Sequence, residues 1–404
     1  MRQRCVEKGR RLRLMHVVFS LETGGLENGV VNLCNGLDRD LFATSVCVFR
    51  AGGALASRLD TAEVELTLVR RYLNTDPSLP VRLAWELRRQ RVDIIHTHSW
   101  GTLVEGVLAA KLARTPVVIH GEHGVMEERP RNIPVQRYLW SKANQLTAVA
   151  DSLADRMVEV VGAARNEIQV IPNGVDSARF RPLPAEQDEC RRQFGLPTTG
   201  LLLGMVARLV PVKNHLGVFR AVAQLKDHGI GVQLALAGDG PLREDLRQAA
   251  TGLGIADRVY FLGNVVRVER LLPALDVFVL NSHTEGMSNT ILEAMSCGVP
   301  VVATAVGSTP AIIADGRSGC LIPAGDVAAL VRALDNLARD PLLRRNMGQT
   351  GRMQIEHGFS IDRMVRDYQE LYLRKASVLL ASRSAGPDRN RRSSSAEQPA
   401  KELI

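Results

Sequence analysis

Short runs of aliphatic residues alternate with amphipathic stretches of helical length along nearly the whole chain. A strand buried on both faces reads as a continuous run of Val, Ile and Leu, and a helix usually connects two parallel strands. The alternation therefore predicts an α/β fold built on parallel sheets. In the first half we expect strands at Leu12–Phe19, Ser45–Phe49, Glu65–Val69, Asp93–His96, Pro116–His120, Gln145–Val149 and Glu167–Ile171. In the second half we expect them at Leu201–Val206, Gly231–Ala237, Val259–Leu262, Val277–Leu280, Val299–Ala303 and Cys320–Ile322.

The alternation pauses at residues 179–199, where prolines lie among charged residues, and this segment is the expected interdomain linker. The 404 residues are too many for one ordinary core, so we expect two doubly wound, Rossmann-like domains at 13–178 and 200–359. Two such domains face each other across a cleft at the carboxyl ends of their sheets. A basic leader (1–12), a final helix (360–378) and a Ser/Arg/Pro-rich tail (379–404) complete the division. The leader and the tail are expected to be disordered.

The composition narrows the class of protein. Aromatic residues make up only 4% of the chain, which disfavours a nucleic-acid binder that stacks bases on aromatic rings. The six cysteines include no C-x-x-C pair, which favours a reducing compartment, the cytoplasm. The sequence contains no run of 18 apolar residues, so we expect no transmembrane helix. The net charge of +8 and the basic leader suit peripheral contact with anionic lipid at the inner membrane face.

The strongest local signal is N-S-H-T-E-G-M-S-N-T-I-L-E-A-M-S-C-G-V-P at 281–300, directly after an expected buried strand. A helix is expected to begin near its middle, and the free backbone N–H groups of that first turn form an anion site. Glu285 lies in the loop and Glu293 about one turn inside the helix. One carboxylate can then reach a sugar ring while the other accepts hydrogen bonds from a ribose diol. The loop residues that would surround the ligand are Gly286, Met287, Ser288 and Asn289.

Two further motifs lie at the ends of expected strands. Arg208 and Lys213 follow the strand Leu201–Val206, where fixed cations would stabilise the charge that develops on a departing diphosphate. Gly24 and Gly25 follow the first strand and let the backbone approach a ligand closely. Each motif also has a plain structural reading, as exposed bases beside a loop and as a tight turn.

Together and in this order, the motifs resemble those of the family 4 retaining glycosyltransferases of GT-B fold. The resemblance covers nearly all of residues 13–375 and is densest in the second half. The matching elements are E-x7-E (Glu285, Glu293), A-M-x-x-G-x-P-V-V (Ala294–Val302), the Arg/Lys diphosphate pair (Arg208, Lys213), I-P-N-G-V-D (Ile171–Asp176), G-x-G-P (Gly238–Pro241) and the glycine loop (Gly24, Gly25).

The resemblance implies transfer of a hexose from a nucleotide-diphosphate sugar to a hydroxyl of a glycan or lipid-linked acceptor, as in exopolysaccharide biosynthesis. The acceptor would attack the face that the diphosphate leaves, with retained configuration and with no metal or other cofactor. Glu285 would then hold hydroxyls of the donor sugar and Glu293 the ribose. His120, which closes the strand Pro116–His120, matches a family histidine that faces the donor sugar. The final helix would pack back on the first domain.

One departure from the family is visible. Family members often carry G-G-x-P-E near the phosphates, whereas this chain has G-S-T-P-A at Gly307–Ala311. The second glycine and the carboxylate are both missing, although the backbone amides around Ser308 can still serve. A sugar contact attributed to that acid is therefore in question, and with it the identity of the donor.

Other functions compete with this interpretation. His96, His98, His120 and His123 lie close together in sequence with a spacing that suits zinc. Asp38-Arg39-Asp40 looks like the D-x-D of metal-dependent glycosyltransferases, but it lies at the wrong edge of a parallel sheet. A GT-B epimerase or hydrolase would need acid/base carboxylates in both domains, and the first domain offers Glu27, Glu105 and Glu122. A nicotinamide-dependent dehydrogenase would need G-x-G-x-x-G, which the sequence does not contain.

Overall fold

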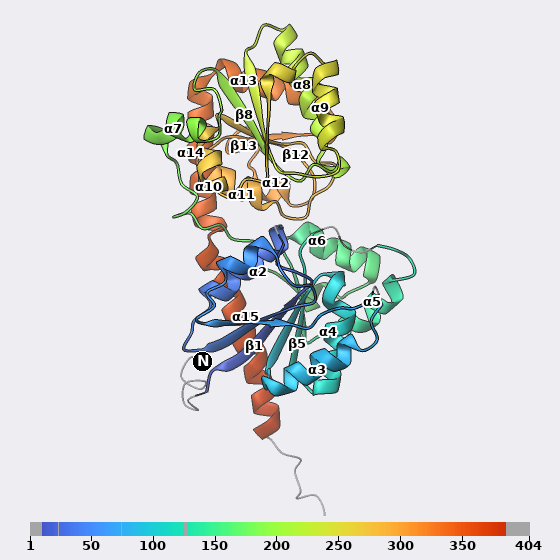
Figure 1. Ribbon diagram of the computed structural model, residues 1–404. Coiled ribbons are helices and arrows are strands. Elements are labelled where there is room, and N and C mark those ends of the chain that lie inside the picture. Colours follow the sequence, from blue (N-terminus) through green and yellow to red (C-terminus); the bar gives the residue numbers. More distant parts are fainter. Residues whose placement is uncertain (1–9, 23, 74, 125, 127, 385–404) are drawn as a thin grey trace, which may run out of the picture.

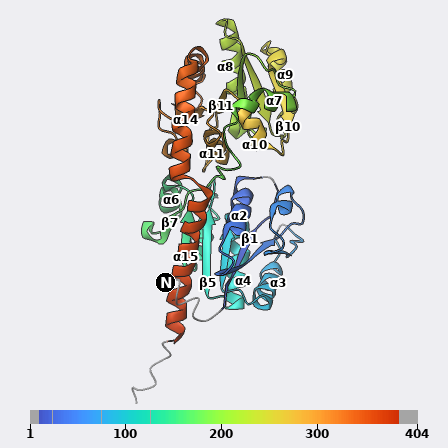
Figure 2. The ribbon, with the colours of Figure 1, turned by 90° about the vertical axis from the view of Figure 1, so that its left-hand side faces the viewer.

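The computed structural model describes residues 10–384, except Thr23, Asn74, Val125 and Glu127. Two α/β domains lie one above the other, and a long helix at the end of the chain runs along the first of them (Figures 1 and 2). The predicted leader lies outside the described residues up to position 9, and the predicted tail lies outside them from position 385. No described helix combines the length and the hydropathy needed to cross a bilayer.

The first domain is built on a parallel sheet of seven strands in the order β3-β2-β1-β4-β5-β6-β7. The order reverses between β1 and β4, the switch point of a doubly wound sheet, where ligands bind at the carboxyl ends of the strands. The strands are β1 Leu12–Val18, β2 Phe42–Val48, β3 Val64–Leu68, β4 Ile94–His98, β5 Val117–Glu122, β6 Gln145–Ala148 and β7 Ile168–Val170.

Side-chain alternation along β4 shows how helices cover both faces of this sheet. His96 bonds Tyr372 of α15 (Ile361–Ser384), whereas Thr97 lies under Gly106 of α4 (Trp100–Ala113) on the opposite face. Contacts place α15 beside α2 (Gly25–Gly36), and α4 beside α3 (Leu79–Arg89) and α5 (Ile133–Trp140). A short α6 (Asp151–Arg156) follows β6.

The second domain has a parallel sheet of six strands in the order β10-β9-β8-β11-β12-β13, with its switch point between β8 and β11. The strands are β8 Leu201–Val206, β9 Val232–Ala237, β10 Val259–Gly263, β11 Val277–Leu280, β12 Val301–Thr304 and β13 Gly319–Ile322. The helices are α8 His215–Asp227, α9 Arg243–Gly252, α10 Val268–Leu271, α11 Asn289–Ser296, α12 Thr309–Ile312, α13 Val327–Arg339 and α14 Pro341–Gly358. Each strand expected from the sequence is present, and the predicted pair of doubly wound domains is confirmed.

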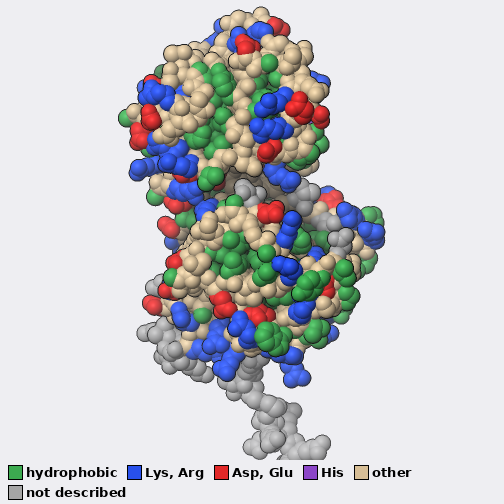
Figure 3. All heavy atoms as spheres, viewed as in Figure 1, with side chains coloured by type: hydrophobic (Ala, Val, Ile, Leu, Met, Phe, Trp, Pro, Cys, Tyr) green, Lys and Arg blue, Asp and Glu red, His purple; other side chains and the backbone are tan. Residues whose placement is uncertain are grey.

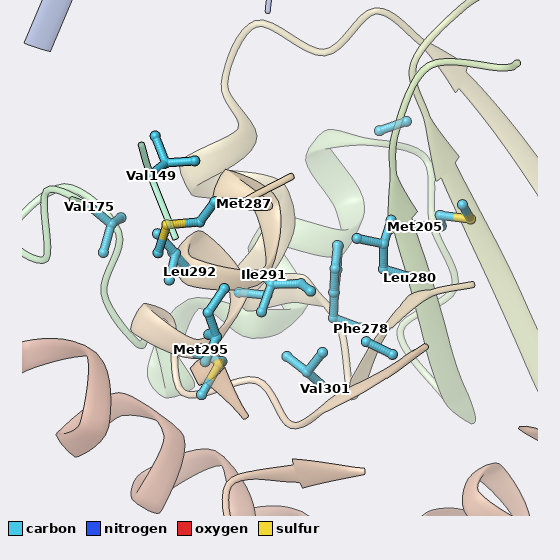
Figure 4. Close-up of a cluster of buried hydrophobic side chains, with 14 of the residues drawn as sticks. Val149, Val175, Met205, Phe278, Leu280, Met287, Ile291, Leu292, Met295 and Val301 are labelled. Carbon is cyan, nitrogen blue, oxygen red and sulfur yellow. The ribbon is translucent and has the colours of Figure 1, made fainter. Parts of the chain in front are cut away.

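One apolar core extends through the second domain and continues into the first. Phe278 of β11 and Ile291 of α11 lie at its centre, and Met287 lies beside Val149 and Val175 of the first domain (Figure 4). Burying these side chains contributes about 1.5–3 kcal/mol each. The loop before α11 is therefore held by packing from both domains, which fixes the functional motif at their boundary.

The segment predicted as a linker, 179–199, is largely part of the second domain. It contains helix α7 (Gln187–Gln193), whose Arg191 is buried, donates to the Ala274 carbonyl at 2.9 Å and pairs with Asp276 at 2.7 Å. Prolines and charges predicted an interdomain linker, but the partner of Arg191 comes from a strand end far along the chain. The two domains are instead bridged by residues near Val175, which forms an isolated β-bridge with Ser360.

The last helix packs on the first domain. Leu371 and Tyr372 are fully buried in a cluster with Leu14, Ile94 and other residues of the first sheet. The chain returns past Gly174, where a Cβ atom would lie 2.6 Å from the Ser360 carbonyl oxygen, so only glycine allows this crossing. The helix runs to Ser384, beyond the expected end at 378.

Candidate active site between the two domains

The loop between β11 and α11 occupies the switch point of the second sheet. Ser288 caps α11, because its Oγ accepts a hydrogen bond from the backbone N–H of Ile291 at 3.4 Å. The His283 N–H donates to the Val212 carbonyl at 2.8 Å, which joins this loop to the loop after β8. The first turn of α11 therefore opens beside the two predicted cations, as an anion site requires.

Lys213 and Glu285 meet directly. The Lys213 Nζ lies 2.5 Å from Glu285 Oε1, and the same oxygen accepts a hydrogen bond from Ser282 Oγ at 2.6 Å. Both side chains are mostly buried, with 22% and 10% of their surface exposed. Arg208 is exposed at the end of the preceding strand, and no described residue pairs with its guanidinium. One cation is thus anchored by a carboxylate and the other is free to take an anion.

Two glycines allow four loops to pack at this point. A Cβ atom on Gly238 would lie 2.0 Å from the Ala207 carbonyl oxygen, and its φ of +131° is strained for other residues. Gly307 has a φ of +55°, and a Cβ atom there would lie 2.0 Å from the Glu285 carbonyl oxygen. These contacts bring the loops after β8, β9, β11 and β12 together around the position of Lys213.

The missing second glycine of the family motif has a structural explanation. Ser308 has a φ of −86°, which any residue adopts, so glycine is not needed there. Its N–H and its hydroxyl both donate to the Gly286 carbonyl, at 3.0 and 2.6 Å. Ser308 therefore stabilises the loop that carries Glu285.

The first domain touches this loop closely. Asn289 donates to the Gly25 carbonyl at 3.0 Å and accepts a hydrogen bond from Asn173 at 2.9 Å. A Cβ atom on Gly286 would lie 2.6 Å from the Cα of Gly124. No role was predicted for Asn173, although it lies within the I-P-N-G-V-D motif. The surface is hollowed between the two domains (Figure 3), and these contacts lie along that boundary.

The structure does not bring His120 to the domain boundary with the other predicted site residues. Its ring is fully buried between Thr97 Oγ1 at 2.8 Å and Glu122 Oε1 at 3.0 Å. The cause is the length of β5, which runs to Glu122 and not to His120. The histidine at the domain boundary is His123, which follows the strand and whose carbonyl oxygen would lie 2.9 Å from a Cβ atom on Gly286.

A row of histidines leads from half-buried His123 into the buried interior of the first domain. His123 Nε2 lies 2.8 Å from His98 Nδ1, and His98 Nε2 lies 3.0 Å from His16 Nδ1. Burial holds the pKa of each well below the usual 6.5, at about 3 for His16 and about 4 for His123. His16, His96 and His98 each offer a nitrogen within 4.8 Å of the others, a grouping that could hold a metal ion. This set differs from the four histidines that the sequence suggested, because His120 points to the other face of the sheet.

Glu293 lies in a separate pocket and not beside Lys213. The pocket is lined by residues of both domains, among them Asn28, Arg58, Arg179 and Asn289. Burial raises the pKa of Glu293 to about 7, and the nearby arginines oppose that rise. A hydrogen-bond donor that enters this pocket would favour the ionised carboxylate.

The carboxylates needed for the alternative functions are mostly engaged elsewhere. Glu105 pairs with Arg71, and Glu122 bonds the buried His120. Glu27 remains near Gly24, and burial raises its pKa. The Asp38–Asp40 motif forms a turn between α2 and β2, where the Asp40 N–H donates to Asp38.

Comparisons with known proteins agree with this geometry. A family model described as Glycosyltransferase Family 4 matches residues 23–179, and one described as Glycosyl transferases group 1 matches residues 186–354. The chain is 30% identical over 297 residues to a UDP-Gal:alpha-D-GlcNAc-diphosphoundecaprenol alpha-1,3-galactosyltransferase of Escherichia coli, covering 71% of this chain and 76% of that protein. It is 28% identical over 310 residues to an N-acetyl-alpha-D-glucosaminyl L-malate synthase of Bacillus anthracis, covering 74% and 80% of the two chains. The structure of Anabaena Alr3699/HepE in complex with UDP-glucose matches it with a TM-score of 0.80 at 22% identity, covering 90% of this chain and 100% of that chain.

Proposed function

Because this chain belongs to the family 4 glycosyltransferases with a group 1 second domain and has the GT-B fold, we propose that it transfers a hexose from a nucleoside-diphosphate sugar to a hydroxyl of a glycan or lipid-linked acceptor. The transfer retains the anomeric configuration and uses no metal ion.

The anchored Lys213 beside the mouth of α11 is the observation that carries this proposal. An ammonium group has three donors, and Glu285 engages one of them, so Lys213 can hold a diphosphate at the same time. Arg208 would supply a second, bidentate contact, and the first N–H groups of α11 would complete the anion site. Positive groups fixed before the reaction stabilise the charge that develops as the diphosphate leaves.

The proposed step needs no nucleophile from the protein. The bond between the anomeric carbon and the diphosphate oxygen breaks, and its electron pair stays on the diphosphate. The acceptor hydroxyl oxygen bonds to the anomeric carbon on the same face. Its proton passes to an oxygen of the departing phosphate, so atoms and charge balance. Closure of the two domains would exclude water that otherwise hydrolyses the donor.

His123 replaces His120 as the histidine that would face the donor sugar. In the histidine row, His16 Nε2 is buried without a partner, and an unpaired lone pair is tolerated better than an unpaired N–H. His16 therefore donates to His98, and His98 donates to His123 Nε2. His123 then carries its proton on Nδ1 and would donate it to a sugar hydroxyl.

Glu293 would bind the ribose. Its pocket lies at the domain boundary and contains Asn289, whose backbone begins α11. Two ribose hydroxyls donating to the carboxylate would supply the hydrogen bonds that the buried group lacks. Glu285 would contact the donor sugar from its position beside Lys213.

The acceptor is proposed from the nature of a relative. The Escherichia coli relative acts on a sugar carried by diphosphoundecaprenol, which supports a lipid-linked acceptor for this chain, as in exopolysaccharide assembly. The free thiols of Cys34, Cys47, Cys190, Cys297 and Cys320 suit a reducing compartment, so we place the reaction in the cytoplasm, at the inner membrane face.

A donor panel tests this function. The protein is mixed with nucleoside-diphosphate hexoses and a diphosphoundecaprenol-linked sugar, with and without excess chelator, and the product linkage is read by NMR. We expect one donor to be used, the anomeric configuration of the donor to be kept, and turnover to survive the chelator. The proposal would be contradicted by inversion of the anomeric configuration or by release of free sugar at the same rate without acceptor. It would also be contradicted if the chelator abolished turnover and zinc restored it.

A further inference from the structure

Three helices on one face of the first domain expose large apolar side chains. Val81 and Trp85 of α3, Leu108 and Leu112 of α4, and Val135 and Tyr138 of α5 lie on the outer sides of their helices. Trp85 is 64% exposed and Tyr138 is 55% exposed. Figure 3 shows hydrophobic and basic side chains together on the side of the lower domain where Figure 1 places these helices. We call this set the α3–α5 surface.

The spacing shows that these side chains are additional to the core. Leu108 and Leu112 are one turn apart on the outer side of α4, while Leu103 and Val107 fill the core on its inner side. A helix that is apolar on both sides is usually buried on both sides. A surface helix with this pattern indicates that something apolar covers it when the protein works.

The charges that α3, α4 and α5 themselves expose are of one sign. The exposed charged side chains of α3, α4 and α5 are all Arg or Lys, among them Arg88, Lys111 and Arg137. The two carboxylates of these helices, Glu86 and Glu105, are buried and pair with arginines. An apolar centre with aromatic residues and a basic rim complements an anionic bilayer, because Trp and Tyr prefer the lipid interface while Arg and Lys reach the phosphates.

We propose that the α3–α5 surface binds an anionic lipid bilayer. Figure 1 shows α5 in the part of the first domain that lies toward the second domain, so a bilayer at this surface would lie beside the domain boundary. This arrangement would deliver a lipid-linked acceptor, as the proposed function requires, but binding itself can be measured without any turnover. The residues of this surface are not those of the basic leader, which also was expected to meet lipid.

Vesicle binding of the full chain tests this surface. Sedimentation with phosphatidylcholine vesicles, with or without phosphatidylglycerol, gives the partition constant, and brominated lipids report the depth of Trp85. We expect binding that needs phosphatidylglycerol, a blue shift of Trp85 emission and quenching by bromine. Trp85 is the probe of choice because it is the exposed tryptophan of this surface, whereas Trp140 is buried and Trp100 is half-buried outside the α3–α5 surface.

Matched variants locate the contact. Two double variants change this surface, and each is expected to weaken binding about 10-fold or more. One combines Trp85→Ser with Leu112→Ser, and the other combines Arg88→Glu with Lys111→Glu. The control pair Leu342→Ser with Arg332→Glu changes equally exposed residues of the second domain and should bind as wild type. All variants should keep turnover on a water-soluble acceptor, which separates failure of this surface from failure of the proposed function. Three results would each overturn the inference. The first is unchanged binding by both surface variants, and the second is binding that is lost only on deletion of residues 1–12. The third is self-association through these helices without lipid binding.

Discussion

Replacement of Lys213 with alanine is expected to lower turnover by about 100-fold or more, because a fixed cation at a departing diphosphate contributes roughly 3–4 kcal/mol to transition-state stabilisation. Lys213 is held 2.5 Å from Glu285, so its ammonium is in place before the donor binds. The substitution removes that charge and leaves Glu285 with Ser282 as its partner. Steady-state kinetics with the preferred donor measure the effect.

Two controls separate catalysis from folding in this experiment. Lys226→Ala changes a lysine of α8 that donates to the Gly254 carbonyl at the surface, and it should leave turnover unchanged. Lys213→Arg keeps the charge but not the geometry, and should retain part of the activity. If the Lys213→Ala protein is folded and turns over like wild type, Lys213 does not stabilise the leaving group.

Lowering the pH from 7 to 5 is expected to destabilise the fold by several kcal/mol. The pKa of His16 is held at about 3 and that of His123 at about 4 by burial, against about 6.5 in the unfolded chain. The unfolded chain therefore binds more protons in this range, and the stabilising contribution that is complete above pH 6.5 is lost as the pH falls. Each of these two histidines accounts for about 2 kcal/mol at pH 5, and His96 and His98 act in the same direction.

Glu293 opposes this loss of stability at low pH, because it can bind one extra proton in the folded protein. Its raised pKa means that the folded protein binds more protons than the unfolded chain between about pH 4.5 and 7, so it stabilises the fold as the pH falls. Urea unfolding at several pH values gives the net slope. His16→Gln should reduce the slope by about one proton. A stability that is constant from pH 7 to 5 would contradict the neutral histidine row.

Periodicity predicted the strands and both sheets because aliphatic runs and helix-length connections are local properties of the sequence. Periodicity does not determine where a strand ends, and this matters at His120: β5 continues for two more residues, to Glu122, so that His123 is the histidine that follows the strand. The register and order of strands also brought His16 next to His98, although they are far apart in sequence. No spacing along the chain reveals such a row.

The helix α7 and the position of Glu293 depended on tertiary contacts. Arg191 is buried because Asp276 and the Ala274 carbonyl are its partners, and neither is near it in the sequence. Spacing alone placed Glu285 in the loop and Glu293 about one turn inside the helix, without the residues that surround each carboxylate. In the structure Glu285 pairs with Lys213, whereas Glu293 lines a pocket together with Arg58 and Arg179.

A crystal structure of the protein bound to UDP tests the central claim most directly, since a solved neighbour contains UDP-glucose. We predict that the diphosphate oxygens lie within hydrogen-bond distance of Arg208 and Lys213, in front of the first turn of α11, with the ribose hydroxyls on Glu293. A diphosphate bound elsewhere in the molecule, with Arg208 and Lys213 out of contact with it, would contradict the account.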